Sequence, residues 1–223
     1  MIKTEILKLS ADNQDKPLLQ RAAEIINRGG VIAFPTETVY ALGADAMNER
    51  AVQKVFHLKK RMSGKPVAIF LPKLQDLKRF VKEITPSASR LIKELWPGPL
   101  TLIFKSRPGQ MTYLTGKERK LGVRVSSSNF VQTLLIETRT PLTATSANLA
   151  GKPEPVSAEQ VLSYFDGKID LVINGGHSES ATPSSVVDVS EEIPILLREG
   201  RIPYEKLKKV VPELERKQSR AGS

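Results

Sequence analysis

Cysteine is absent from the 223-residue sequence, and histidine occurs only twice. The chain therefore has no thiol for disulfide formation or nucleophilic catalysis, and its residues give little basis for a metal centre held by protein side chains. The two common phosphate-binding strings, Gly-x-x-x-x-Gly-Lys-[Ser/Thr] and Gly-x-Gly-x-x-Gly, are also missing. If a nucleotide binds, side chains must hold its phosphates.

Long apolar runs and targeting patterns are missing as well. No stretch approaches the roughly 20 consecutive apolar residues that span a bilayer, so we expect no membrane partner. Residues 1–10 have neither the apolar core of a signal peptide nor the pattern of a transit peptide. Together with the lack of cysteine, which suits a reducing compartment, these observations predict a soluble, cytoplasmic protein.

Positive charge is in excess: 34 Lys and Arg against 24 Asp and Glu give a formal net charge of +10, which favours anionic partners. Aromatic residues make up only 5% of the chain, so base stacking on single strands is disfavoured and any RNA would be recognised by shape or phosphates. Part of the excess lies in residues 204–223, which we interpret as a short basic helix and a frayed tail. A solvated tail is the simplest explanation, and a tRNA or partner contact is the alternative.

Helix and strand patterns are mixed along the whole chain, without a linker, a composition break or an internal repeat. A helix is predicted between Pro17 and the stop at Gly29-Gly30, and a second helix begins near Asn48 and ends before Lys59. Further helices are expected at 76–83, 87–95, 130–137 and 157–165, and strands at 31–34, 67–71, 100–104, 121–125, 142–145, 171–173, 185–189 and 195–197. This pattern predicts a single α/β domain, residues 8–203, around a twisted mixed sheet.

Fixed cations and small polar side chains stand near the ends of these elements. Lys59 and Arg61 follow the second helix, where cations are favoured by the helix dipole even without a ligand. Ser146 and Asn148 follow a strand two positions apart, so they can face the same side, although both are also common turn formers. Hydroxyls and cations recur at other strand ends, where open α/β sheets collect ligands, and this favours a site for a phosphorylated ligand.

Several motifs in one order resemble the YrdC-like, or TsaC-type, threonylcarbamoyl-AMP synthases over residues 18–202. The motifs are Phe34-Pro35-Thr36-Glu37-Thr38-Val39-Tyr40-Ala41-Leu42-Gly43, Lys59-Lys60-Arg61, Trp96-Pro97-Gly98-Pro99-Leu100-Thr101, Gly122-Val123-Arg124-Val125, Thr145-Ser146-Ala147-Asn148, Ser184-Ser185-Val186-Val187-Asp188 and Leu197-Arg198-Glu199-Gly200. The resemblance implies a twisted sheet with flanking helices around a basic cavity. It also implies synthesis of threonylcarbamoyl-AMP and pyrophosphate from L-threonine, bicarbonate or CO2, and ATP with Mg²⁺, for tRNA modification by a separate threonylcarbamoyl transferase complex.

The resemblance also implies roles for individual residues. Lys59 and Arg61 would be the catalytic cations, and with Ser146, Asn148 and Arg198 they would bind ATP. The threonine-binding residues would be Thr36 or Thr38, Arg124 and Ser184. A bidentate clamp on the amino-acid carboxylate suits the guanidinium of Arg124 better than it would suit a lysine. No metal ligand among the side chains is implied.

Two alternatives stay open. The first is a binding module for structured RNA, such as tRNA or another double-stranded RNA, favoured by the positive charge. The second is a relative like YciO that binds nucleotide with little synthase activity, since Lys60 and Met62 stand where the family usually has Gly and Pro. The complete set of Lys59, Arg61, Ser146 and Asn148 favours the synthase. Only about 20 residues follow Ile202, too few for a further domain, so we expect the short form of the family.

Overall fold

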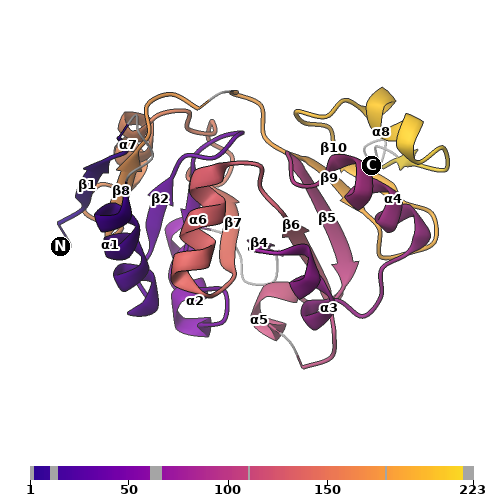
Figure 1. Ribbon diagram of the computed structural model, residues 1–223, viewed down its shortest axis with the longest axis horizontal. Helices are drawn as coiled ribbons and strands as arrows, with labels where there is room; N and C mark the ends of the chain where they lie inside the picture. The colour runs from indigo at the N-terminus through magenta and orange to yellow at the C-terminus, as the bar shows by residue number, and fades with distance from the viewer. Residues whose placement is uncertain (1–2, 11–14, 61–66, 110, 179, 218–223) are drawn as a thin grey trace.

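A computed structural model describes residues 3–10, 15–60, 67–109, 111–178 and 180–217. Its strands form one 11-stranded sheet that crosses the molecule from the N-terminal end to the C-terminal end (Figure 1). In spatial order the strands are β1 (Glu5–Lys8), β8 (Leu171–Asn174), β2 (Ile32–Phe34), β3 (Ala41–Gly43), β7 (Leu142–Ser146), β4 (Ala68–Phe70), β6 (Lys120–Arg124), β5 (Leu100–Lys105), β9 (Ser185–Asp188), β10 (Ile195–Arg198) and β11 (Glu215–Arg216).

The sheet is mixed, as predicted. β2 and β3 form an antiparallel hairpin around residues 35–40, and β3 continues antiparallel to β7, with Ala41 opposite Ser146. β4 runs parallel to β6 with Phe70 opposite Arg124, and β5 runs parallel to β9 with Leu100 opposite Ser185. These pairings bring strands that are distant in the sequence next to one another.

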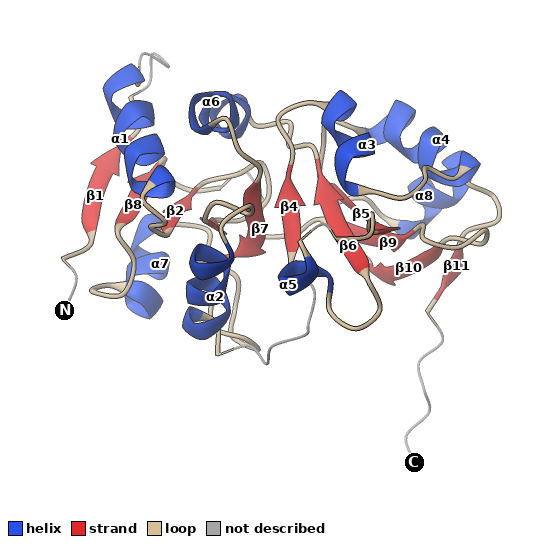
Figure 2. Cartoon of the chain, turned by 90° about the horizontal axis from the view of Figure 1, so that it is seen from below, coloured by secondary structure: helices blue, strands red, loops and turns tan. Residues whose placement is uncertain are grey.

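Helices lie on both faces of the sheet (Figure 2). One face carries α1 (Lys16–Asn27), α6 (Asn129–Thr138), α3 (Leu77–Phe80) and α4 (Pro86–Leu95), with a 3-10 turn at Leu74–Asp76. The other face carries α2 (Glu49–Leu58), α7 (Ala158–Phe165) and the short α5 (Thr112–Thr115), and α8 (Tyr204–Val210) lies beside β10 and β11. The arrangement confirms the predicted α/β fold.

The strands of the C-terminal half have one apolar face and one partly polar face. On β5, Leu100, Leu102 and Phe104 are fully buried in a core with α3 and α4, while Thr101 and Ile103 line a cavity on the opposite face. On β6, Leu121 and Val123 belong to the same core, and the alternate residues Lys120, Gly122 and Arg124 line the cavity. The two-residue period of a strand therefore builds the core and the cavity floor from one sequence.

The sequence also predicts α2 correctly. Asn48 is its N-cap and accepts a hydrogen bond from the backbone N–H of Ala51, and Val52, Val55 and Phe56 are buried as expected. The helix ends with Lys59 as its C-cap. This end point carries Lys59 to the cavity.

The tail differs from its prediction. The expected helix is present as α8, but the chain then packs further instead of fraying, because Leu207, Val211 and Leu214 are buried in the core and Glu215–Arg216 pairs with β10. The expectation of a frayed tail is therefore wrong up to Arg216, and residues 218–223 lie outside the described part. β1 and β3 are two further strands that the sequence did not predict.

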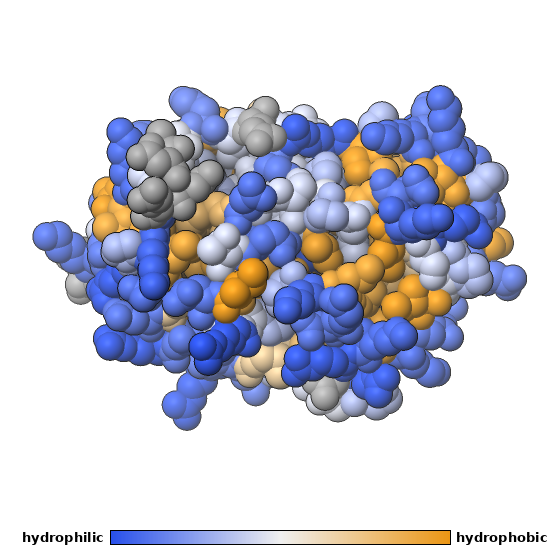
Figure 3. Space-filling view, viewed as in Figure 1, coloured by the Kyte–Doolittle hydropathy of each residue, from blue (hydrophilic) through white to orange (hydrophobic). Residues whose placement is uncertain are grey.

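Hydrophilic residues surround most of the edge of the molecular face that carries α1, α6, α3 and α4 (Figure 3). Hydrophobic side chains show on this face mainly on the right-hand side, over the β5 and α4 region. Within the residues that the structure describes, none of the helices has the length and apolar character needed to cross a bilayer.

Candidate active site

A cavity of about 990 Å³ lies on the face of the sheet opposite the core with α3 and α4, and residues of β3, β7, β4, β6, β5 and β9 contribute to its lining. It is lined by all the described side chains for which the sequence predicted a role: Thr36, Thr38, Lys59, Arg124, Ser146, Asn148, Ser184 and Arg198. Arg61, the remaining predicted residue, lies outside the described part of the chain. Segments that are distant in the sequence thus meet at one cavity, as a single binding site requires.

Lys59 is buried and holds the segment 146–148 in place. Its ammonium donates to the carbonyl oxygen of Ser146 at 2.5 Å, and to the carbonyl oxygen and Oδ1 of Asn148 at 2.9 and 3.0 Å. Only 4% of Lys59 is exposed, so these bonds compensate the cost of burying an ammonium group. Lys59 therefore organises the Ser-x-Asn segment as well as contributing positive charge to the cavity.

Ser146 and Asn148 also face each other directly. The Ser146 hydroxyl donates to Asn148 Oδ1 at 2.7 Å, which confirms the prediction that the two side chains share one side. The amide nitrogen of Asn148 donates to the carbonyl oxygen of Lys152 in the following loop. The two side chains are thus fixed in orientation before any ligand binds.

Thr36 and Thr38 form a short hydroxyl chain that leads to Arg124. The Thr36 hydroxyl donates to the carbonyl oxygen of Val39 at 2.7 Å, so in its 2.9 Å contact with the Thr38 hydroxyl it must accept. Thr38 in turn accepts from Nη1 and Nη2 of Arg124, both at 3.2 Å. Since both hydroxyl hydrogens are used within the protein, the threonines support Arg124 in this arrangement.

Arg124 is not the open bidentate clamp that the sequence favours. Its Nε donates to the carbonyl oxygen of Gly98 at 3.3 Å, and Nη2 lies 2.9 Å from Glu37 Oε1 in addition to its bond to Thr38. With Nη1 also bonded to Thr38, four of its five N–H groups are bonded to described residues, and one on Nη1 has no partner among them. Burial lowers the pKa of Arg124 and the charge of Glu37 opposes that shift. The group stays cationic, as arginine does in proteins.

Glu37 is a site residue that the sequence analysis missed. Its carboxylate accepts hydrogen bonds from the Ser126 hydroxyl at 2.5 Å and the Ser127 N–H at 3.0 Å, besides its salt bridge with Arg124. Burial alone raises the pKa of Glu37, but the charge of Arg124 and these hydrogen bonds outweigh it, so the pKa lies below its ordinary value. The one feature of the sequence that could have pointed to Glu37 is its place between Thr36 and Thr38. That place does not show that the Glu37 side chain is buried or that it pairs with Arg124.

The lowered pKa of Glu37 predicts how stability depends on pH. A carboxylate whose pKa is lower in the folded state stabilises the fold above its unfolded pKa, and that contribution is lost as the pH falls through the folded pKa. Glu37→Gln is therefore expected to have a lower Tm than the wild type at pH 7, with a smaller decline on acidification from about pH 5. Thermal unfolding at pH 7 and at stepwise lower pH tests this, with the exposed Glu94→Gln as control. Parallel curves for Glu37→Gln and wild type would contradict it.

Ser184 and Arg198 form the opposite wall of the cavity. Nε and Nη2 of Arg198 donate to the carbonyl oxygen of Ser184 at 3.1 and 2.9 Å, and the Ser184 hydroxyl lies 2.9 Å from that of Thr101. Arg198 Nη1 also lies 3.6 Å from Glu154 Oε1, in the loop after Asn148. A Cβ on Gly200 would lie 2.3 Å from the carbonyl oxygen of Pro183, so only glycine allows the two segments to approach this closely.

The far part of the cavity floor contains a second ion pair that the sequence analysis did not single out. Lys120 Nζ lies 2.8 Å from Asp188 Oδ2, and a contact of 4.0 Å joins Lys120 to Glu118. Burial lowers the pKa of Lys120, but the hydrogen bond and charge of Asp188 raise it overall. For Asp188 the effect of burial is likewise outweighed by Lys120 and Ser190, and its pKa is lowered.

The cavity lining has an excess of positive charge. Among the described residues, the basic side chains that line it are Lys59, Lys60, Lys120, Arg124, Lys152 and Arg198, and the acidic ones are Glu118, Glu154 and Asp188. Such a lining favours an anionic ligand. In the same part of the chain, no three His, Cys, Asp or Glu side chains are grouped so that they could hold a metal ion.

Comparison with known proteins agrees with this geometry. A family model for Sua5, YciO and YrdC proteins, described as telomere recombination, matches residues 24–200. The chain belongs to the Sua5/YciO/YrdC family. Among curated members, the threonylcarbamoyl-AMP synthase of Pyrococcus abyssi is 39% identical over 193 residues, which cover 86% of this chain and 57% of that protein. The threonylcarbamoyl-AMP synthase of Bacillus subtilis is 35% identical over 196 residues, with 87% and 57% covered.

Solved structures of the family have the same fold. P. abyssi Sua5 complexed with L-threonine superposes with a TM-score of 0.89 at 36% identity, over 96% of this chain and 62% of that one. Escherichia coli YciO superposes with a TM-score of 0.80 at 27% identity, over 93% of this chain and all of that one. The chain therefore spans somewhat more than half the length of its synthase relatives and the full length of YciO.

Proposed function

We propose that the protein is an L-threonylcarbamoyl-AMP synthase, which makes threonylcarbamoyl-AMP and pyrophosphate from L-threonine, bicarbonate or CO2, and ATP. The main support for the proposal is that Lys59, the Ser146–Asn148 pair and Arg124 line the same cationic cavity. The name of the P. abyssi and B. subtilis relatives and the threonine complex of P. abyssi Sua5 support it.

The two ends of the site would take different parts of the substrates. We assign the threonine carboxylate to the remaining N–H of Arg124 and to Ser184, and assign Thr36 and Thr38 to holding Arg124 in its orientation. The ATP phosphates would lie near Ser146 and Asn148, with Lys59, Arg61 and Arg198 as the surrounding cations. Mg²⁺ would arrive with ATP, whose phosphate oxygens are the ligands that this ion prefers.

The chemistry needs no protein nucleophile. The threonine amine adds to CO2 and loses a proton to give a carbamate, and a carbamate oxygen then attacks the α-phosphorus of ATP. The bond from that phosphorus to the bridging oxygen breaks, and pyrophosphate leaves with the electron pair. The protein contributes positioning and charge neutralisation, because two anions must come into contact. The fixed cations and oriented polar groups of the cavity suit this task.

The biological setting follows from the same proposal. The product would pass to a threonylcarbamoyl transferase complex for tRNA modification, in the cytoplasm. The basic surface could also contact the tRNA or another double-stranded RNA, and we expect any such affinity to fall steeply with salt.

Pyrophosphate release with each substrate omitted in turn tests the proposal. We expect release only when L-threonine, bicarbonate and ATP are all present, without any RNA. Replacement of L-threonine by L-alanine serves as the matched control for the amino acid. Release that does not depend on threonine, or no release under any condition, would contradict the proposed function.

The same assay distinguishes the main alternative. Because the chain matches YciO over that protein's whole length, a nucleotide-binding protein with little synthase activity is the second candidate. It predicts ATP binding by calorimetry without threonine-dependent turnover.

A further inference from the structure

The cations around the cavity differ in how far their charges are already compensated. Arg124, Lys120 and Arg198 each have a carboxylate partner, in Glu37, Asp188 and Glu154 respectively. The ammonium of Lys59 is bonded to oxygens of Ser146 and Asn148. By contrast, Lys60 and Lys152 line the cavity with exposed side chains that form no salt bridge or hydrogen bond to any described residue. These two ammonium groups can therefore bind an anion without first breaking a contact with a described residue.

The backbone places both lysines at the same rim. Lys60 directly follows Lys59, and Lys152 follows Asn148 by four positions. The N–H of Ala150 donates to the carbonyl oxygen of Lys59 at 3.2 Å, and Asn148 Nδ2 donates to the carbonyl oxygen of Lys152. Both lysines thus lie next to Lys59 and Asn148, in the part of the cavity that we assign to the phosphates.

Lys60 occupies a backbone position that favours glycine. Its φ is +49°, in the left-handed region just after the end of α2, where its N–H donates to the carbonyl oxygen of His57 at 3.0 Å. A side chain in this region costs stability that glycine would not. Lys60 therefore keeps, at this cost, a cation at the cavity rim that has no side-chain partner among the described residues. Strain of this kind gathers at ligand sites, so Lys60 is a candidate for function.

We propose that Lys60 and Lys152 form an outer phosphate subsite, which binds the terminal phosphates of a nucleoside triphosphate and the pyrophosphate released from it. The inner groups at Ser146 and Asn148 would hold the phosphate that stays with the nucleoside. The inference rests on the proposed function, because it takes ATP as the ligand of this part of the cavity. The ligand chemistry is that of a polyphosphate chain, recognised by two exposed ammonium groups.

Isothermal titration calorimetry with ATP, inorganic pyrophosphate and AMP tests the subsite. The double variant K60A/K152A is expected to bind ATP and pyrophosphate roughly tenfold more weakly, because two exposed ammonium–phosphate contacts are lost. Its affinity for AMP should stay within about twofold of the wild type. The contrast between ATP and AMP separates loss of an outer subsite from general damage to the cavity.

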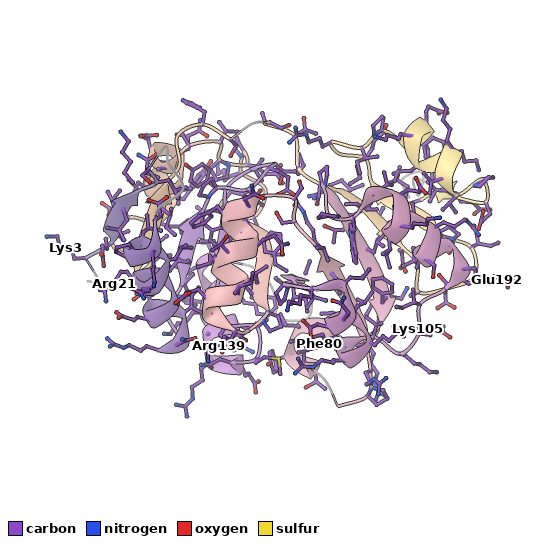
Figure 4. All side chains as sticks on the ribbon, in the orientation of Figure 1. Lys3, Arg21, Phe80, Lys105, Arg139 and Glu192 are labelled. Carbon is purple, nitrogen blue, oxygen red and sulfur yellow. The ribbon has the colours of Figure 1, made fainter. Side chains whose placement is uncertain are left out.

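The variant K60G tests whether Lys60 binds phosphate, because it combines a measurement of Tm with a measurement of ATP affinity. A lysine without a binding role would change the Tm alone. Glycine relieves the left-handed backbone, so the Tm is expected to rise by about 2–4 °C while the affinity for ATP falls. R139G is the matched control, because Arg139 is an exposed cation with φ +56° at the end of another helix, α6, and does not line the cavity. It lies at the lower end of α6 (Figure 4). R139G should raise the Tm in the same way and leave ATP binding unchanged.

Three results would overturn the proposal. They are unchanged ATP and pyrophosphate affinity in K60A/K152A, an equal loss of affinity for AMP, and a loss of tRNA affinity with ATP binding intact. If the wild type binds neither ATP nor pyrophosphate, the proposed function itself fails, and the subsite fails with it. If the wild type shows threonine-dependent turnover but the variants match it in ATP affinity, only the subsite is wrong.

Discussion

Lys59→Ala is expected to lower threonine-dependent pyrophosphate release by about a thousandfold. Two unit anions 4 Å apart repel by about 4 kcal/mol at an effective dielectric of 20, and a barrier raised by that amount slows a reaction about a thousandfold. The substitution also removes the three bonds that hold Ser146 and Asn148, so the phosphate-binding groups would lose their orientation. The kcat of pyrophosphate release measures the effect.

Lys54→Ala is the control for this prediction. Lys54 lies on the same helix α2 and donates to the carbonyl oxygen of Gly29, and it does not line the cavity. We expect it to keep near wild-type turnover, so the loss in Lys59→Ala would reflect the site and not the removal of a lysine from α2. Turnover of Lys59→Ala within about tenfold of the wild type would show that Lys59 has no such role.

Arg124→Gln is expected to destabilise the fold and to remove threonine binding together. Removing one partner of a buried ion pair costs about 3–5 kcal/mol, because it leaves the other charge buried and unpaired. Glu37 and Arg124 have side chains that are only 5% and 7% exposed, so this case applies to them. A Tm lower by roughly 10 °C is expected for a chain of this size.

The double variant E37Q/R124Q separates the two effects. With both charges gone, no buried charge is left unpaired, so much of the lost Tm should return. Threonine binding should remain absent, because the double variant still has no guanidinium for the carboxylate. Calorimetric titration with L-threonine and thermal unfolding of all four proteins provide the test. Recovery of threonine binding in the double variant would show that Arg124 supports the fold and does not bind the substrate.

Local patterns predicted the elements that carry the phosphate side of the site. The Asn48 cap and the apolar positions of α2 determine where that helix ends, and so where Lys59 lies. The two-residue spacing of Ser146 and Asn148 predicted that their side chains can face the same side, and in the structure they also form a hydrogen bond. The Asn48 cap and the Ser146–Asn148 hydrogen bond are each formed within a few residues of the chain, whereas the bonds from Lys59 to Ser146 and Asn148 depend on the fold.

Interactions between distant segments could not be predicted in this way. β1 is stable only as a partner of β8, with Glu5 opposite Leu171, and its short sequence contains no sign of that pairing. The salt bridge of Glu37 with Arg124 depends in the same way on the fold, because it joins a hairpin loop to the end of β6. For this reason the sequence presents Arg124 as an open clamp, whereas the structure shows most of its donors already engaged.

A crystal structure of the protein with L-threonine and an ATP analogue that cannot be cleaved between the α- and β-phosphates would show whether one cavity binds both substrates. We expect both ligands in the one cavity, with the threonine carboxylate at Arg124 and Ser184 and the phosphates beside Ser146 and Asn148. The amine of threonine should face the α-phosphorus, with room for CO2 between them. A nucleotide bound elsewhere on the molecule, or threonine bound away from Arg124, would show that the cavity is not the active site proposed above.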